Sequence, residues 1–453
     1  MVREGGSLGR PLVQEYPSAP RTTGTARMTT RYALDITRLI ARGRRPAATG
    51  IDRVLLEYAT FFRRRFRDRL DFVATLGDQL LTIPPPLADS LLDSVHRRWT
   101  GACIASAGKQ RSDGTGHGVT ARATAHRRIL NRLGARALGT RGFRHAALAL
   151  GGRPYRNAGG SIYINVSHKR LDVVAALKRR GPSRLRGVVM LHDLHPLTHP
   201  RFFPASLNRE FEQGVRSVAR SADLIICNSD QTADDLHRWI AKEGLRSPRT
   251  AVLPLGGRSP GPATVGQCCD KPYFVCLGSL DDRKNVAFTV AVWEQIIRAG
   301  NGAAIPELHL VGAPDARSRW LTRIAESPAA AHIHLVHGLN DQGVDELLRG
   351  SRALLFPSLA EGFGLPVLEA LSLGVPVICS DLPALRQSGA GVPKYLKTDA
   401  VDDWAAAVQT YMPGSSRARA EQLSRLLEAD LPSWSKHFDG LMGYFAELDA
   451  TAS

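Results

Sequence analysis

Two carboxylates that flank a short glycine-containing loop are the strongest candidates for chemistry in this chain. Glu361 stands before the loop, and Glu369 lies about one turn inside the helix expected after it. The loop between them is formed by four residues: Gly362, Phe363, Gly364 and Leu365. Glycine lets a backbone approach a ligand closely, and a helix N-terminus attracts an anion. At these positions Glu361 can accept hydrogen bonds from sugar hydroxyls, and Glu369 can reach a ribose. The alternatives are a helix-capping acid and a carboxylate on a solvated helix face.

A pair of cations follows another apolar run upstream. Residues 273–277 are typical of a buried strand, and they are followed by Gly278 and Ser279, then by Arg283 and Lys284. Ligands of open α/β sheets bind at the carboxyl ends of the strands. We therefore expect Arg283 and Lys284 to face a diphosphate that rests on the glycine-containing loop, with Ser279 close to the same diphosphate. The alternative is an exposed basic turn.

Other catalytic motifs are not found in the sequence. His332, His334 and His337 alternate along a predicted strand without a cysteine or carboxylate at metal-ligand spacing, so a zinc site is not expected. The sequence contains neither a phosphate-binding P-loop nor a serine nucleophile elbow. It also lacks an Asp-x-Asp triplet that could hold a divalent ion on a nucleotide sugar. We therefore predict no metal and no cofactor.

The elements around these residues alternate between strands and helices. Apolar runs typical of buried strands occur at 32–36, 70–76, 161–166, 187–191, 223–227, 273–277, 308–311, 333–336, 353–356 and 375–379. Amphipathic segments with helical spacing separate them, which predicts an α/β fold with two doubly wound, parallel-sheet domains. The expected organisation is a disordered basic tail at 1–29, a first domain at 30–255, a linker at 256–271, a second domain at 272–430 and a final helix at 431–453.

Composition narrows the class of protein. The chain has 453 residues, of which 43% are hydrophobic and 23% charged, so wholesale disorder is excluded. No apolar stretch approaches the roughly 18 residues of a membrane-spanning helix. The six cysteines show no Cys-x-x-Cys spacing, which favours reduced thiols in a cytosolic protein.

The net charge of +18 favours an anionic partner, namely nucleic acid, an anionic membrane or a phosphorylated substrate. Aromatic residues make up only 6% of the chain and do not interleave with basic motifs, so nucleic acid is not expected. The basic segment 122–144 resembles an amphipathic helix without balancing acids. We interpret this segment either as a surface that docks on anionic lipid or a lipid-diphosphate acceptor, or as a solvated helix.

Together, these segments resemble the retaining glycosyltransferases of family 4 (group 1), which have the GT-B fold of two Rossmann-like domains that face each other across a cleft. The resemblance runs from about Tyr32 to the end and is strongest over 273–379. It implies that Glu361 contacts the donor sugar, Glu369 the nucleotide ribose and Lys284 the diphosphate. Many members have an arginine where this chain has Ser279, and the neighbouring Arg283 is expected to supply that second positive charge.

The first half of the chain also resembles this family. Thr49 and Gly50 look like the glycine loop that lines the cleft, where they would meet the donor phosphate or the acceptor. The alternative is an ordinary turn. His192 ends a predicted strand, as the family's cleft histidine does, and is taken as a catalytic candidate rather than a structural histidine. His195 and His199 are interpreted as structural.

The resemblance implies a metal-independent retaining glycosyltransferase with Lys284, Glu361 and His192 as catalytic candidates. Its C-terminal helices, which open at Trp434, are expected to cross back onto the first domain. It would move a hexose from a nucleotide-diphosphate sugar to a polysaccharide or lipid-linked oligosaccharide, with mannose from GDP-mannose as the first expectation. We expect a cytoplasmic protein that docks peripherally on the inner face of the membrane. The alternatives are another GT-B enzyme, such as a phosphorylase or a sugar-nucleotide epimerase, and a basic nucleic-acid-binding protein without enzymatic activity.

Overall fold

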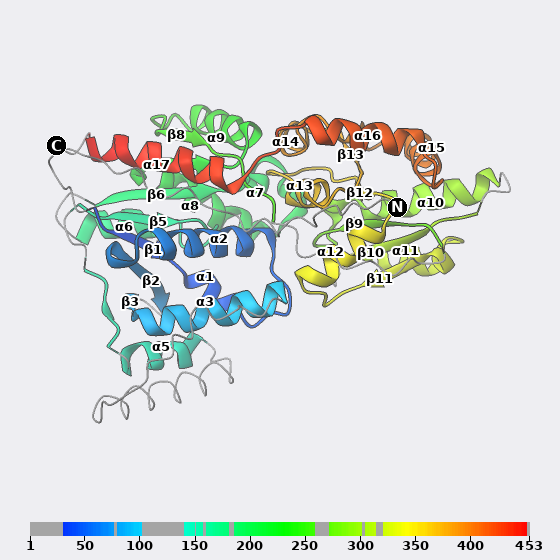
Figure 1. Cartoon of the computed structure of the whole chain (residues 1–453). Coiled ribbons are helices and arrows are strands. Elements are labelled where there is room, and N and C mark those ends of the chain that lie inside the picture. The colour runs from blue at the N-terminus through cyan, green and yellow to red at the C-terminus, as the bar shows by residue number, and fades with distance from the viewer. Residues whose placement is uncertain are drawn as a thin grey trace, which may run out of the picture.

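The structure is a computed structural model of the whole chain (Figure 1). It describes residues 30–76, 79–101, 140–149, 151–156, 160–180, 185–258, 271–300, 304–313 and 320–450. The basic tail 1–29, most of the basic segment 122–144 and most of the linker 256–271 lie outside the described residues.

The first domain contains an eight-stranded sheet of order β4-β3-β2-β1-β5-β6-β7-β8. Its strands are β1 (Tyr32–Asp35), β2 (Leu70–Leu76), β3 (Gln79–Ile83), β4 (Arg153–Pro154), β5 (Ile162–Asn165), β6 (Arg186–Leu191), β7 (Leu224–Cys227) and β8 (Thr250–Val252). Its helices are α1 (Thr37–Arg42), α2 (Gly50–Arg65), α3 (Pro85–Thr100), α5 (Thr140–Ala149), α6 (Val173–Arg180), α7 (His195–Thr198), α8 (Ala205–Ser221) and α9 (Asp230–Lys242). β1, β2 and β5 to β8 are parallel, whereas β3 pairs antiparallel with β2 and β4, an edge that the sequence pattern did not predict.

The second domain contains a six-stranded sheet of order β11-β10-β9-β12-β13-β14, with parallel pairing throughout. Its strands are β9 (Tyr273–Leu277), β10 (Glu307–Val311), β11 (Ile333–Val336), β12 (Leu354–Phe356), β13 (Val377–Ser380) and β14 (Lys394–Leu396). Its helices are α10 (Val286–Ala299), α11 (Trp320–Glu326), α12 (Asp341–Gly350), α13 (Leu365–Ser372), α14 (Pro383–Ser388), α15 (Val401–Tyr411) and α16 (Arg417–Glu428). The predicted α/β fold with two doubly wound domains is therefore confirmed.

The strand order of the second sheet determines where a ligand can bind. The chain proceeds from β9 outward in one direction to β11, and then returns to β12 on the other side of β9. The order reverses between β9 and β12, and a crevice forms outside the carboxyl ends of strands at such a reversal. Arg283 and Lys284 follow β9, and Glu361 follows β12. The topology therefore brings these three residues to one switch point.

The last helix, α17 (Trp434–Ala450), packs on the first domain rather than on the second (Figure 1). Phe438 stacks on Phe61 of α2 with ring centroids 3.9 Å apart. The Nε2 atom of His437 lies 2.7 Å from the Tyr58 hydroxyl in the same core. Burial of these aromatic rings holds α17 on the first domain, because large apolar side chains dominate packing energetics.

Two further features bear on the environment of the protein. Among the helices that the structure describes, none combines the length and apolar character needed to cross a bilayer. The three cysteines inside the described ranges, Cys227, Cys276 and Cys379, are buried free thiols.

Replacing Phe438 by alanine should lower the free energy of unfolding of the chain by about 3–5 kcal/mol, because it leaves a cavity against Phe61. Urea unfolding followed by tryptophan fluorescence measures this change. Lys436→Ala is the matched control on the exposed side of α17 and should stay within about 0.5 kcal/mol of the wild type. Equal midpoints for the two variants would contradict the packing of α17 on α2.

Candidate active site

Lys284 and Glu361 form an ion pair at the switch point of the second sheet. Lys284 ends the short 3₁₀ helix Asp282–Lys284 after β9, and its side chain is 8% exposed. Arg283 Nη1 lies 3.7 Å from Glu361 Oε2. The two loops are also joined by the backbone, since the Leu359 N–H donates to the Arg283 carbonyl at 2.9 Å. Two cations and one carboxylate are therefore held together inside the protein.

The charges in this group depend on one another. Burial lowers the pKa of Lys284, although Glu361 acts against this shift. For Glu361, burial would raise the pKa, but Lys284 and Arg283 outweigh it and hold the pKa below its usual range. Glu361 is thus a carboxylate at neutral pH. The Lys284 ammonium also lies 4.3 Å from the centroid of the Phe356 ring, a cation–π contact.

The glycine-containing loop packs directly against the first domain. A Cβ atom on Gly362 would come within 1.9 Å of the His192 carbonyl oxygen, so no larger residue fits. The Gly362 carbonyl accepts hydrogen bonds from Ser229 Oγ at 2.5 Å and Thr232 Oγ1 at 3.3 Å. The close approach at Gly362 is therefore to the backbone of the other domain. This contact sets the position of the neighbouring Glu361.

The remaining loop residues begin α13. Gly364 is the N-cap with φ of 89°, a left-handed conformation that favours glycine. Phe363 is buried in the core of the first domain, and Leu365 packs against the same core. Glu361 is therefore not the helix cap, and its carboxylate remains with the two cations.

His192 lies at the carboxyl end of β6 with a buried ring. Its Nε2 is 2.9 Å from the Val166 carbonyl oxygen, and burial lowers its pKa to about 3, so the ring is neutral at physiological pH. The next residue, Asp193, was not singled out from the sequence. Burial would raise the pKa of Asp193, but His195, His168 and Arg283 lower it to about 2. Asp193 therefore adds a third carboxylate to the electrostatic environment of Arg283, after Glu361 and Asp281.

Glu369 is 5% exposed and belongs to a second group of charges. Its Oε1 lies 3.1 Å from Arg258 Nε and 3.9 Å from Arg53 Nε. Arg258 Nη2 also lies 2.8 Å from Asp345 Oδ1, and Arg53 forms an ion pair with Asp341. Arg53 belongs to the first domain, so this group joins the two domains.

The two carboxyl groups beside Arg258, those of Glu369 and Asp345, have pKa values that shift in opposite directions. Burial would raise the pKa of Glu369, but Arg258 and Arg53 lower it below its usual range. Asp345 differs, because burial raises its pKa to about 6 despite the nearby Arg258. Sequence reasoning placed Arg258 in a linker and passed over Arg53, since neither belongs to a local motif.

The other predicted site residues are Thr49 and Gly50 at the start of α2, and Ser279 after β9. Thr49 is the N-cap of α2, and its hydroxyl donates a hydrogen bond to the Asp52 carboxylate at 2.7 Å. Gly50 is exposed, and a Cβ atom there would lie 3.3 Å from Leu365 of the second domain. The exposed Ser279 donates its hydroxyl hydrogen to Asp281 at 2.9 Å. The predicted cleft loop thus faces the start of α13.

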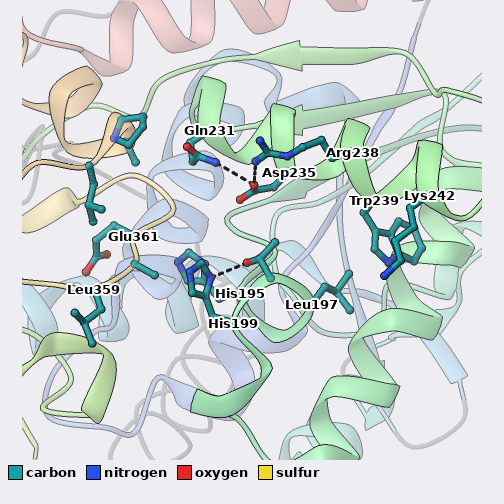
Figure 2. A pocket seen from close by; sticks show the side chains of 15 residues that line it. His195, Leu197, His199, Gln231, Asp235, Arg238, Trp239, Lys242, Leu359 and Glu361 are labelled. Carbon is teal, nitrogen blue, oxygen red and sulfur yellow. Dashed lines mark hydrogen bonds and ion pairs between the residues drawn. The ribbon is translucent and has the colours of Figure 1, made fainter.

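A cleft of about 540 Å³ lies between the domains and reaches Glu361 (Figure 2). The first domain lines it with residues of α7 and α9, among them His195, Asp235 and Trp239. The second domain lines it with residues 359–361 and 382–384. Within the described part of the chain, no three His, Cys, Asp or Glu residues are grouped as metal ligands would be.

The buried histidine at the end of β6 should make stability depend on pH. The folded-state pKa of His192 is about 3, below the value of about 6.5 in an unfolded chain, so the unfolded state binds more protons between these values. Stability should therefore fall as the pH drops below 6.5, by about 2 kcal/mol at pH 5 from His192 alone. Urea unfolding from pH 7.5 to 5 measures this slope.

His192→Gln supplies the control, because a glutamine amide can still donate to the Val166 carbonyl but does not titrate. The loss of stability between pH 7.5 and 5 should shrink by about 2 kcal/mol in this variant. An unchanged slope would show that His192 titrates normally in the folded protein.

Residues 271–412 match the family model described as Glycosyl transferases group 1. Two curated relatives come from Escherichia coli. The serotype-specific mannosyltransferase WbdA is 28% identical over 245 residues, which cover 49% of this chain and 29% of the relative. The O-antigen chain mannosyltransferase B is 28% identical over 215 residues, which cover 46% of this chain and 56% of the relative. The matches therefore span less than two thirds of either relative.

Two solved structures resemble nearly the whole chain. Sucrose-phosphate synthase from Thermosynechococcus elongatus has a TM-score of 0.55 at 16% identity and covers 94% of this chain and 100% of its own. WaaG, a glycosyltransferase involved in lipopolysaccharide biosynthesis, has a TM-score of 0.54 at 14% identity. The match covers 90% of this chain and 98% of WaaG. At such low identity these likenesses concern the fold. The chain therefore contains a glycosyltransferase group 1 domain within a GT-B fold, as its motifs predicted.

Proposed function

We propose that this protein is a metal-independent, retaining glycosyltransferase that moves a hexose from a nucleotide-diphosphate sugar to a glycan. The observation that carries the proposal is that Lys284, Arg283 and Glu361 meet at the switch point of the second sheet. All three residues lie within the segment that matches the glycosyl transferases group 1 model. The names of the E. coli relatives favour mannose, with GDP-mannose as the first candidate donor.

The difficult step is the departure of the nucleoside diphosphate, because negative charge grows on it as the anomeric bond breaks. In the proposed mechanism, Lys284 and Arg283 stabilise this charge together with backbone amides of the loop before α13. Fixed donors in a water-poor site act strongly, since they need no reorganisation during the reaction. The buried Glu361 then orients the sugar from which the diphosphate leaves.

The proposed reaction breaks the bond from the anomeric carbon to the diphosphate oxygen and forms a bond from that carbon to an acceptor hydroxyl oxygen. The acceptor's proton passes to a phosphate oxygen of the leaving diphosphate, so the products are a glycoside and a nucleoside diphosphate. Attack from the face of the leaving group retains the anomeric configuration. Contact between the domains at Gly362 helps exclude water, which would otherwise hydrolyse the donor.

A polysaccharide or lipid-linked oligosaccharide is the proposed acceptor, in keeping with the O-antigen relative. A lipid-linked acceptor would place the reaction at the inner, cytoplasmic face of the membrane. The basic segment 122–144 would then be the surface that docks on anionic lipid.

The proposal is tested by incubating the full chain with nucleotide sugars, GDP-mannose first, and mannose-containing oligosaccharides. We expect nucleoside diphosphate release that depends on the acceptor, and a glycoside with retained configuration by proton NMR. Conversion of the donor without an acceptor would indicate an epimerase, and sugar phosphate formed from inorganic phosphate would indicate a phosphorylase. Either outcome would overturn the proposal.

In the same assay, Lys284→Ala and Glu361→Ala should each lower kcat by about 100-fold or more. Circular dichroism checks the fold. Lys271→Ala is the control, because this lysine lies on the surface of the same domain with a 71% exposed side chain. Near-normal turnover in both folded variants would refute the assignment of the site.

Glu369→Ala should raise the KM for the donor about tenfold and leave kcat nearly unchanged, because the lost contact is to the ribose, which does not react. The matched control is Asp345→Asn, which changes another partner of Arg258. It should leave the donor KM within about twofold of the wild type. Equal increases of KM in the two variants would show that Glu369 acts only by holding Arg258.

A further inference from the structure

His195 has a ring whose hydrogen-bonding groups are unused. The residue is 4% exposed, and neither of its ring nitrogens has a hydrogen-bond partner among the described residues. Buried polar side chains are nearly always hydrogen-bonded, and a neutral imidazole offers one donor and one acceptor. His195 also lines the interdomain cleft, as does Glu361 (Figure 2). Both nitrogens are buried from solvent in the structure, so a ligand in the cleft would bond to them once the ring turns toward it.

The opposite wall of the cleft presents a rigid carboxylate. Asp235 on α9 is 9% exposed and accepts a hydrogen bond from Gln231 Nε2 at 2.9 Å. It also forms an ion pair with Arg238 (Figure 2). These contacts come from the same helix and hold the carboxylate in one orientation. Such a group can accept hydrogen bonds from ligand hydroxyls without first losing rotamer entropy.

Trp239 completes the wall at the end of the cleft away from Glu361 (Figure 2). Its ring is half-buried, and the Arg216 guanidinium lies 5.5 Å from the ring centroid. Small-ligand sites typically combine aromatic surface with a few well-placed polar groups, in volumes of roughly 300–1,000 Å³. The cleft of about 540 Å³ lies in this range. A sugar ring has matching chemistry, with hydroxyls at its edge and C–H groups on its faces.

The place of the cleft separates it from the site of the diphosphate. Glu361 borders the cleft, whereas the two cations Arg283 and Lys284 are not among its lining residues. If the donor sugar lies at Glu361 as proposed above, the cleft extends from the reacting carbon toward α9 of the first domain. A molecule that fills the cleft then meets the donor at Glu361.

We infer that this cleft binds the terminal sugar of the glycan acceptor, and that His195 determines acceptor specificity by hydrogen bonding to a sugar hydroxyl. The inference rests on the proposed function and names the residues that select its second substrate. It assigns to His195 a binding role in place of the structural role expected from the sequence.

The experiment measures binding of glycans and nucleotide separately on the full chain. Isothermal titration with GDP and UDP reports the nucleotide site. Saturation-transfer NMR and titration with α-linked mannobiose and mannotriose, and with the glucose and galactose disaccharides, report the cleft in the presence of saturating nucleotide. We expect at least one glycan to bind the wild type. In His195→Leu, which keeps a similar side-chain volume, its affinity should fall at least tenfold while nucleotide affinity stays within twofold.

His237→Leu is the matched control, because His237 is exposed on α9 with its Nε2 3.2 Å from Thr250 Oγ1, and it is not among the residues that line the cleft. It should bind glycan and nucleotide as the wild type does. Asp235→Asn is a second test that keeps the shape of the side chain and should also weaken glycan binding several-fold. It decides the question if His195→Leu does not fold.

Equal glycan affinity in the wild type and both cleft variants would overturn the inference. So would a wild type that binds nucleotide but none of the glycans, and in that case the proposed function would stand. A wild type that binds neither nucleotide nor glycan would overturn both.

Discussion

The buried ion pair between Lys284 and Glu361 is the interaction on which the rest of the site depends. Charges inside a protein are costly unless they are paired, and removing one partner leaves the other uncompensated. In the structure Glu361 is the partner of both Lys284 and the adjacent Arg283. A bound diphosphate would bring further negative charge to the same two cations. The need to pair charges in a buried crevice therefore explains why these three side chains are held together.

The position of this ion pair also depends on the first domain. Gly362 follows Glu361 directly and packs against the His192 carbonyl just after β6. Its own carbonyl accepts hydrogen bonds from Ser229 and Thr232 at the start of α9. Arg53 forms the second link through its contacts with Asp341 and Glu369. A change in the angle between the domains would thus move the carboxylates of both Glu361 and Glu369. This coupling suits an enzyme that must assemble its site when the domains close.

Much of the fold could be predicted from local patterns. The runs that become β7 and β9 are apolar throughout because both faces of a parallel sheet are covered by helices. The antiparallel edge at β3 and β4 could not be predicted, since β4 has only two residues and its pairing joins segments distant in the chain. The short helix α14 was missed for a similar reason, because six residues carry too little periodicity.

The sequence by itself determined the chemical inventory: two cations after one strand, two acids around a glycine-containing loop after another, and a strand–helix alternation that brings both to one sheet edge. Spacing along the chain carries this information because each group lies next to its own strand. Only the tertiary structure decided that Arg258 pairs with Glu369, that the close approach at Gly362 is to the His192 carbonyl, and that His195 borders the cleft with unpartnered nitrogens. These contacts join residues far apart in the chain, and packing between two domains leaves no signature in the local pattern of either.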